Sequence, residues 1–280
     1  MKQKNKKHLR TFLKFLLKVI FYYPFKFLWY ILTKLVTTIY VFIKNKYSTH
    51  KQTTLQTKAN QSRTHTTYEP FHELKSLKGT LPEFEQKILH NKSTIGIILG
   101  ARGTGKSALA MRLVENIIAK TNKHAYAMGF SSTSLPAWIT LITTTDEITN
   151  NSLVVIDESG ISFSSRSSMS SSSKLLSALL LIARHKDVSV IFITQNSANL
   201  EINAIRQADY LLLKPSSLLQ KDFERKKIQD IYLEAQSDFD KLKSHIGLTY
   251  IYADSYRGFV TNTLPSFWSE NLSKSFANKK

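Results

Sequence analysis

The sequence predicts an α/β fold with a mostly parallel sheet. A glycine-rich octapeptide, residues 100–107, lies between a short apolar stretch (Ile95 to Leu99) and a helical pattern that begins at Ala108. Downstream, apolar runs of strand length alternate with helical patterns, which is typical of strand–helix–strand units in a parallel sheet. An aromatic and basic segment precedes this region and predicts a membrane-associated helical segment at the N-terminus.

The octapeptide reads G-x-x-x-x-G-K-S, the pattern of a phosphate-binding P-loop, or Walker A motif. Its glycines let the backbone wrap around a phosphate, with N–H groups pointing inward at a helix N-terminus. We expect Lys106 to reach the β- and γ-phosphates and the Ser107 hydroxyl to hold Mg²⁺. The expected nucleotide-binding residues are Gly100, Ala101, Arg102, Gly103, Thr104, Gly105, Lys106 and Ser107. The motif therefore predicts that the chain binds ATP or GTP.

A second motif follows about fifty residues later. The apolar stretch from Leu153 to Ile156 ends in two carboxylates, Asp157 and Glu158, as expected for a Walker B strand. Asp157 is predicted to lie beside Mg²⁺, usually through its water shell, and Glu158 to polarise the attacking water. These two residues extend the prediction from nucleotide binding to hydrolysis.

Charge is distributed unevenly along the 280 residues. The part before Glu69 contains 14 Lys and Arg and no carboxylate, and the rest contains 25 Lys and Arg against 20 Asp and Glu, so +14 and +5 make up the net charge of +19. This asymmetry indicates an anionic partner for the N-terminal part, either phospholipid or nucleic acid. The chain has no cysteine, which excludes disulfides and thiolate metal sites. The only metal we expect is nucleotide-bound Mg²⁺.

Residues 1–44 predict a basic, aromatic, membrane-associated helical segment. Lysines interrupt its apolar residues, so no run reaches the about 18–20 uncharged residues of a simple transmembrane helix. Either an amphipathic helix lies in the membrane interface, or residues 19–43 span the bilayer with Lys26 and Lys34 buried in an oligomer or channel. We expect residues 9–43 to bind membrane lipids. A soluble DNA-binding arm and a core helix of the main domain are the alternatives.

The remaining chain divides into three parts. Residues 45–80 are a polar tether and lead-in, because Thr, Gln, Lys, Ser and Asn dominate as far as Thr67 and cannot bury a core. Apolar anchors return without a clean period from Tyr68 to Leu89. The P-loop domain is assigned to residues 81–262 and a polar C-terminal tail to residues 263–280, anchored at most by Phe267 and Trp268.

The other predicted elements follow from the same patterns. Strands are expected at residues 124–130, 138–143, 188–193 and 209–214, helices at 108–120, 174–184, 199–207 and 218–239, and a β-hairpin at 249–260. Residues 159–173 contain ten serines and predict either a flexible loop or a mobile segment that contacts phosphates. Gln195 follows the strand beside Walker B, where a polar side chain is well placed to sense the γ-phosphate.

Together these motifs resemble the FtsK/HerA superfamily of P-loop motor ATPases, and within it the zonular occludens toxin-like (Zot) and viral DNA-packaging ATPases. The resemblance covers roughly residues 94–214. It rests on the two Walker motifs, on Ala183-Arg184-His185, on Ile191-Phe192-Ile193-Thr194-Gln195, and on the run from Ile205 to Tyr210.

The resemblance implies a RecA-like sheet, ATP hydrolysis at the subunit interfaces of a homo-oligomeric ring (usually a hexamer), and movement of DNA. It also implies that Glu158 is the catalytic base and Gln195 the sensor. An arginine donated by a neighbouring subunit is needed, and Arg184 and Arg206 are the candidates, with Arg166 third. In the phage Zot-like proteins the membrane helix follows the ATPase domain, whereas here the apolar segment precedes it.

The sequence thus predicts a membrane-attached, ATP-hydrolysing motor, with its ATPase domain on the cytoplasmic side or at a virion or host membrane. It would translocate DNA for genome packaging, virion extrusion or assembly, or DNA transfer, with coat or portal proteins as further partners. The alternative is a Zot-like morphogenesis or secretion ATPase that acts on coat or secreted protein. A small-molecule kinase is disfavoured, because it needs neither a membrane segment nor a Walker B Asp-Glu pair.

Overall fold

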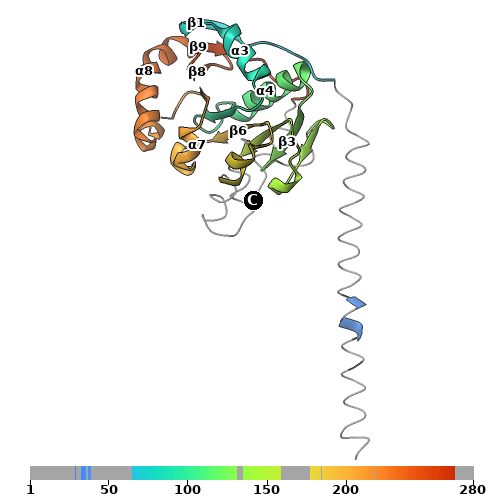
Figure 1. The fold of residues 1–280 in the computed structure, drawn as a ribbon. Coiled ribbons are helices and arrows are strands. Elements are labelled where there is room, and N and C mark those ends of the chain that lie inside the picture. The colour runs from blue at the N-terminus through green and yellow to red at the C-terminus, as the bar shows by residue number, and fades with distance from the viewer. Residues whose placement is uncertain are drawn as a thin grey trace, which may run out of the picture. The chain divides into compact units, whose positions relative to one another are not determined.

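The computed structural model describes residues 29, 33–35, 37–38, 65–130, 135–158, 177–183, 185–217 and 219–268 (Figure 1). The chain divides into two units, Met1–Gln61 and Ser62–Lys280. In the first unit the described residues, from 29 to 38, are helical. No helix in the described part of the chain combines the length and apolarity needed to cross a membrane. Most of the predicted membrane segment, the serine-rich stretch and Arg184 lie outside the described residues.

One sheet organises the second unit, and its nine described strands run in the order β1-β9-β8-β7-β2-β6-β5-β3-β4. The six strands from β7 to β4 are parallel, while β8, β9 and β1 extend the sheet in antiparallel fashion. The predicted α/β class with a mostly parallel sheet is confirmed. The strands are β1 (His72–Gly79), β2 (Ile95–Leu99), β3 (His124–Met128), β4 (Ile139–Leu141), β5 (Ser152–Asp157), β6 (Val188–Thr194), β7 (Tyr210–Leu213), β8 (Thr249–Ala253) and β9 (Tyr256–Thr261).

Helices cover both faces of this sheet. The central strand β2 shows this, since its alternate residues point to opposite faces and enter two different cores. Ile98 joins the core that contains α3 (Leu81–His90) and α4 (Lys106–Lys120). Ile97 and Leu99 join the core that contains α7 (Ile202–Arg206), α8 (Lys226–Leu242) and the helical residues 177–183. Every residue of β2 is buried, as expected for a central parallel strand. Three short 3₁₀ helices complete the described elements: η2 (Thr145–Glu147), η3 (Ser197–Asn199) and η4 (Gln220–Phe223).

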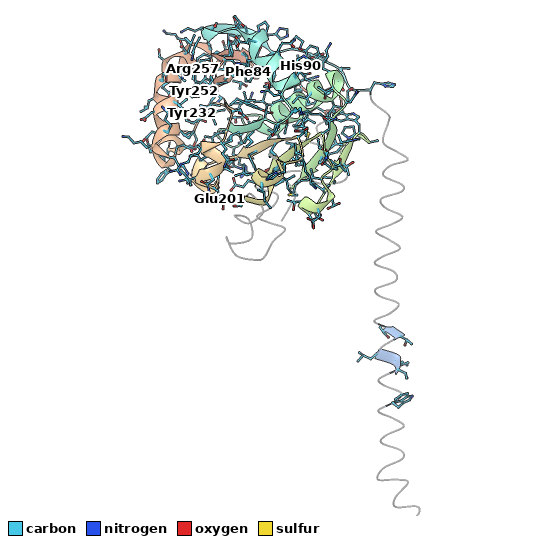
Figure 2. The ribbon with its side chains drawn as sticks, in the orientation of Figure 1. Phe84, His90, Glu201, Tyr232, Tyr252 and Arg257 are labelled. Carbon is cyan, nitrogen blue, oxygen red and sulfur yellow. The ribbon has the colours of Figure 1, made fainter. Side chains whose placement is uncertain are left out.

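The C-terminal hairpin, β8 and β9, forms where the sequence predicts it and packs against α8. Phe239 of α8 contacts the ring of Phe259 edge-on, with 5.2 Å between centroids. Across the hairpin, the Arg257 guanidinium lies 4.2 Å from the centre of the Tyr252 ring (Figure 2). The α8 region differs from the single predicted helix over 218–239, since η4 and α8 are separate and α8 continues to Leu242.

The sheet begins earlier than the predicted domain start at residue 81. Strand β1 pairs antiparallel with β9, from His72 opposite Thr261 to Gly79 opposite Tyr256. Its side chains are exposed except for the half-buried Leu74. A strand held mainly by backbone pairing at a solvated sheet edge carries no alternating apolar pattern, so the sequence offers no signal for it.

Near both ends of the described part of the second unit, the chain binds to helix α4. Arg112 and Glu115 form a buried ion pair on this helix, with 3.0 Å between Nη1 and Oε2 and exposed fractions of 2% and 0%. The amide of Thr67, from the end of the predicted tether, donates to Glu115 Oε1 at 3.1 Å. The amide of Ser266, from the predicted tail, donates to Glu115 Oε2 at 3.0 Å. The helix that begins at the P-loop therefore also holds the segments around Thr67 and Ser266.

Candidate nucleotide-binding site

The P-loop connects β2 to α4, as the motif predicts. Gly105 is the N-cap of α4 with φ of 84°, a left-handed conformation that only glycine adopts without strain. Gly100 lies against β7, and a Cβ at this position would meet Lys214 Cβ at 2.5 Å. The first glycine is therefore required by close packing and the last by backbone conformation.

Lys106 lies inside the loop. Its Nζ donates to Ala101 O at 2.8 Å, and Thr104 Oγ1 donates to the same oxygen at 2.7 Å. Burial lowers the pKa of Lys106 to about 8, and the charge of Asp157 opposes that shift. The ammonium thus lies in a poorly hydrated position, where phosphate oxygens would stabilise its charge.

The acidic pair reaches this loop across one intervening strand. Asp157, 7% exposed, is the last residue of β5, and β6 lies between β5 and β2. In the register of β6, Ile193 is opposite Asp157 and Thr194 is opposite Leu99, the residue before the P-loop. The end of β6 therefore lies between the P-loop and the carboxylates.

Thr194 contacts the predicted catalytic base directly. Its hydroxyl donates a short hydrogen bond to Glu158 Oε2. Burial raises the pKa of Glu158, while hydrogen bonds from Thr194 and Asn199 oppose the rise. Sequence reasoning selected the next residue, Gln195, whose side chain is exposed and whose backbone oxygen accepts from Gln220 Nε2 at 2.7 Å. The only signal for Thr194 was a polar residue at the end of a buried strand, and the role of Gln195 stays a prediction.

Residues after β7 hold the loop that follows β6. Gln220 Nε2 also donates to Glu224 Oε1 at 3.0 Å. The other oxygen of that buried carboxylate accepts from the amide of Ser197 at 2.8 Å. The strand end that carries Thr194 is therefore fixed by a second part of the chain, which sequence reasoning did not identify.

The end of β7 supports the P-loop from its other side. The amide of Lys214 donates to Leu99 O at 2.8 Å, and the amide of Ala101 donates to Pro215 O at 3.1 Å. The Lys214 side chain is 1% exposed and its Nζ donates to Gly247 O at 2.8 Å. Burial lowers the pKa of Lys214 to about 7.

The donors at this site fit Mg²⁺ bound together with a nucleotide. Asp157 provides a buried carboxylate, and Ser107 provides a hydroxyl at the start of α4. Mg²⁺ keeps several waters and commonly takes one or two carboxylates plus phosphate oxygens, so this small set is sufficient. Of the predicted arginines, Arg206 is exposed at the last residue of α7, whereas Arg184 and Arg166 lie outside the described residues.

A family model matches a part of the chain that carries some residues of this site. Residues 128–210 match the family described as zonular occludens toxin (Zot), a range that runs from the end of β3 to the start of β7. It includes Asp157, Glu158 and Gln195. The predicted resemblance and the prediction of a P-loop ATPase are confirmed. No curated protein matches the chain.

Several solved structures are similar at low identity. The genome packaging NTPase B204 from Sulfolobus turreted icosahedral virus 2 is 15% identical, covers 62% of this chain and 98% of its own, and has a TM-score of 0.46. EssC (ATPases 2 and 3) from Geobacillus thermodenitrificans is 12% identical over 78% of this chain and 50% of its own, with a TM-score of 0.42. The N-terminal domain of zonular occludens toxin from Neisseria meningitidis is 18% identical over 43% and 76%, with a TM-score of 0.31.

Proposed function

We propose that this chain hydrolyses ATP and uses the energy to translocate DNA while attached to a membrane through residues 9–43. The observation that carries the hydrolytic part is the placement of the Asp157–Glu158 pair beside the P-loop, across the single strand β6. A binding module would need the P-loop alone. A half-buried carboxylate, Glu158, held by Thr194 next to that loop is suited to activating water.

The reaction divides among residues of this chain. Lys106 binds the β- and γ-phosphates, while Ser107 and Asp157 hold Mg²⁺. Bound Mg²⁺ neutralises charge on the phosphate oxygens. Glu158, in its ionised form, accepts a proton as the water oxygen bonds to the γ-phosphorus. The bond between that phosphorus and the β–γ bridging oxygen breaks, and ADP leaves with the electron pair.

Completion of the site requires a second copy of the chain. We infer a homo-oligomer, with six subunits in a RecA-like ring, in which an arginine from a neighbour stabilises the transferred phosphoryl group. The exposure of Arg206 at the end of α7 is compatible with this role, and Arg184 is the other candidate. Gln195 senses the γ-phosphate from the end of β6.

DNA is the proposed cargo because the resemblance is to DNA-moving ATPases, and the part of the chain from Glu69 onward, which contains the ATPase domain, keeps a net charge of +5 of its own. The Zot match favours one alternative, a morphogenesis or secretion ATPase that acts on coat or secreted protein. Both the DNA motor and this alternative place the ATPase at a membrane, on its cytoplasmic side or at a virion or host membrane. The basic and aromatic composition of residues 9–43 supports that location.

The test is steady-state ATP hydrolysis by the full chain, with and without DNA, together with its mass in solution. We expect DNA to stimulate hydrolysis and ATP to favour an oligomer. Lys106→Ala and Glu158→Gln should each lower kcat by roughly 10²-fold or more, since each removes a group that acts on the reacting phosphate or water. Glu234→Gln, on the exposed face of α8, is the matched control and should keep full activity.

Each outcome bears on a different part of the proposal. Substantial hydrolysis in both Lys106→Ala and Glu158→Gln would refute the assigned roles. Hydrolysis that ignores DNA but rises with a coat or secreted protein would replace the DNA motor with the alternative. A monomer in the presence of ATP, with no response to DNA, would exclude the ring motor.

A further inference from the structure

One loop contacts the proposed catalytic base, Glu158, at two points. This η3 loop (residues 194–200) begins at the last residue of β6 and contains η3. At its start, the Thr194 hydroxyl donates a short hydrogen bond to Glu158 Oε2. Near its end, the Asn199 side chain also hydrogen-bonds the Glu158 carboxylate. The orientation of Glu158 therefore depends on the shape of this loop as well as on β5.

The η3 loop cannot satisfy all its own backbone groups. Its helical part is a single turn, Ser197–Asn199, and so short a turn leaves several amides and carbonyls at its ends without a partner inside it. Asn196 supplies one partner, because its side-chain oxygen accepts from the Ala198 amide at 2.8 Å. The shape of the loop therefore requires further partners from another part of the chain.

Arg225 supplies partners for the carbonyls of the loop. Its Nε donates to Ser197 O at 3.1 Å, and its Nη2 donates to Leu200 O at 2.9 Å and to Ala198 O at 3.4 Å. Arg225 is also the N-cap residue of α8, and its amide donates to Ser197 Oγ at 3.0 Å. A planar guanidinium presents several donors in fixed directions, which a lysine ammonium cannot reproduce.

The residue before Arg225 binds the first amide of the same turn. Glu224 is 7% exposed, and its Oε2 accepts from the Ser197 amide at 2.8 Å. Its Oε1 accepts from Gln220 Nε2 at 3.0 Å, and that Nε2 also donates to Gln195 O at 2.7 Å. Glu224 and Arg225 together thus hold the amide side and the carbonyl side of the η3 turn.

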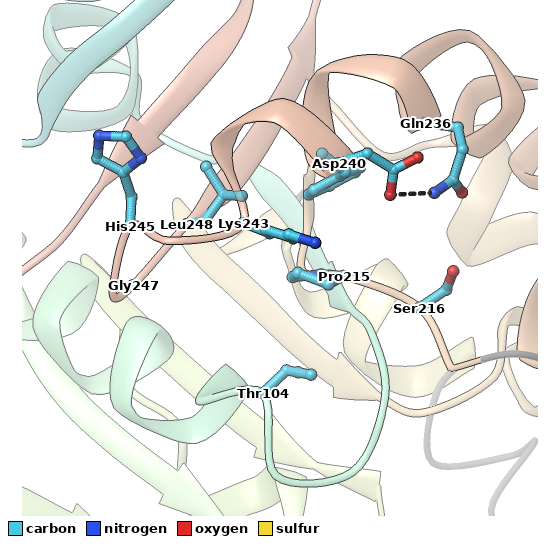
Figure 3. A pocket seen from close by; sticks show the side chains of 10 residues that line it. Thr104, Pro215, Ser216, Gln236, Asp240, Lys243, His245, Gly247 and Leu248 are labelled. Atoms are coloured by element: carbon cyan, nitrogen blue, oxygen red, sulfur yellow. Dashed lines mark hydrogen bonds between the residues drawn. The ribbon is translucent and has the colours of Figure 1, made fainter.

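The segment that carries these two residues also passes the P-loop. It leaves β7 at Pro215 and Ser216, which line a cavity of about 350 Å³ together with Thr104 of the P-loop (Figure 3). Pro215 O accepts from the amide of Ala101 at 3.1 Å. The connection between β7 and α8 is therefore in contact with both the phosphate-binding loop and the loop that holds the base.

We propose that Arg225 is a positioning residue for hydrolysis, which holds the η3 loop in the shape that orients the Glu158 carboxylate toward the attacking water. The inference rests on the proposed function, because it requires Glu158 to act as the base. The bonds of the Arg225 guanidinium go to backbone carbonyls of the η3 loop, and nucleotide binding is assigned to the P-loop. Arg225 should therefore govern the rate of the chemical step and have little influence on the affinity for ATP.

Steady-state ATP hydrolysis by the full chain tests this, with kcat and KM determined separately. Arg225→Met keeps an unbranched side chain and removes the donors, so we expect kcat to fall by roughly tenfold to 100-fold while KM stays within about twofold. Arg225→Lys keeps the charge without the fork and should be intermediate. The matched control is Lys226→Met, which removes a positive charge at the exposed next residue and should keep the kcat and KM of wild type.

A double-mutant cycle shows whether Arg225 acts through the loop. Asn199→Ala, at an exposed position, removes one of the two contacts with Glu158. If Arg225 acts by placing this contact, Arg225→Met should lower kcat by a clearly smaller factor in the Asn199→Ala background than in wild type. If Arg225→Met fails to fold, the cycle is run with Arg225→Lys, which keeps the charge and the length of the side chain.

The outcomes separate this inference from the proposed function. Wild type without ATP hydrolysis, or hydrolysis that Glu158→Gln does not reduce, would overturn the proposed function and this inference with it. Hydrolysis that depends on Glu158 but is as fast in the Arg225 variants as in Lys226→Met would overturn this inference alone. A rise in KM without a fall in kcat, or equal factors in the two backgrounds of the cycle, would also overturn it.

Discussion

Lys214 illustrates how a single residue joins the nucleotide site to the rest of the sheet. Its backbone pairs with the residue before the P-loop, its carbonyl accepts from Tyr232 at 3.1 Å, and its Nζ donates to Gly247 O. Burial lowers the pKa of this ammonium. An ammonium in this position costs free energy of folding, and the neutral amine relieves that cost while it still donates a hydrogen bond.

This gives a pH-dependent prediction for stability. Between the folded pKa of about 7 and the ordinary pKa of 10.5, the unfolded chain holds the Lys214 proton and the folded chain does not, so the free energy of unfolding rises with pH. The stability of wild type relative to Lys214→Met should therefore increase by roughly 1 kcal/mol per pH unit above pH 7. Urea unfolding of the full chain at several pH values measures it. The control is Lys227→Met, at an exposed position. If the difference in free energy of unfolding between wild type and Lys214→Met varied with pH as little as the difference for Lys227→Met, the prediction would be contradicted.

Among the elements, α4 has two functions that meet in one helix. Its first turn carries Lys106 and Ser107, and its second and third turns carry the buried Arg112–Glu115 pair. That pair binds backbone groups of Thr67 and of the segment from Leu264 to Ser266. The helix that begins at the P-loop is thus also the helix to which Thr67 and the segment from Leu264 to Ser266 bind.

Removal of one partner of this pair should be costly. Glu115→Leu leaves the buried Arg112 guanidinium with only the half-exposed Glu69 carboxylate, at 3.6 Å, and removes an acceptor for two amides. We therefore expect a loss of about 3–5 kcal/mol in the free energy of unfolding. The double variant Arg112→Met/Glu115→Leu should lose less, because no unpaired charge remains buried.

The exposed pair Glu83–Lys87 on α3, at 3.1 Å, provides the control for the same measurement by urea denaturation. Glu83→Gln should cost no more than about 0.5 kcal/mol, since both side chains stay in water. If Glu115→Leu were as mild as Glu83→Gln, the Arg112–Glu115 pair would not hold the segments around Thr67 and Ser266.

At the scale of the whole molecule, the division at residues 61 and 62 separates two kinds of chain. The second unit carries the complete set of motifs and both cores. The first unit contains the segment rich in basic and in aromatic residues, which we propose to be the membrane attachment. A motor joined to a membrane would keep its substrate entry at a fixed surface, which suits packaging, extrusion and transfer alike.

Vesicle sedimentation tests the attachment. We expect the full chain to sediment with vesicles that contain phosphatidylserine, and residues 62–280 to stay in the supernatant. Each Lys or Arg near an anionic surface contributes about 1 kcal/mol to the free energy of membrane binding. Because this attraction is electrostatic, added salt should weaken the binding of the full chain, and so should replacement of phosphatidylserine by neutral phosphatidylcholine. Equal sedimentation of both chains would remove residues 9–43 from the proposed role.

The sequence by itself determined the features that depend on consecutive residues. The P-loop between β2 and α4, the Walker B strand with Asp157 and Glu158, and the hairpin of β8 and β9 were all predictable, because each is defined by local pattern and spacing. Buried parallel strands such as β6 were equally clear as continuous apolar runs.

Only the tertiary structure decided which distant residues complete the site. Thr194 meets Glu158, and Lys214 supports Gly100, because the strand order places β6 and β7 on either side of β2. Edge strand β1 left no apolar pattern, since all its side chains except Leu74 are exposed, and it is held by backbone pairing with β9 and by polar contacts of Glu73 and Lys75. Strand order and long-range hydrogen bonds depend on the packing of the whole chain, and a local pattern does not record them.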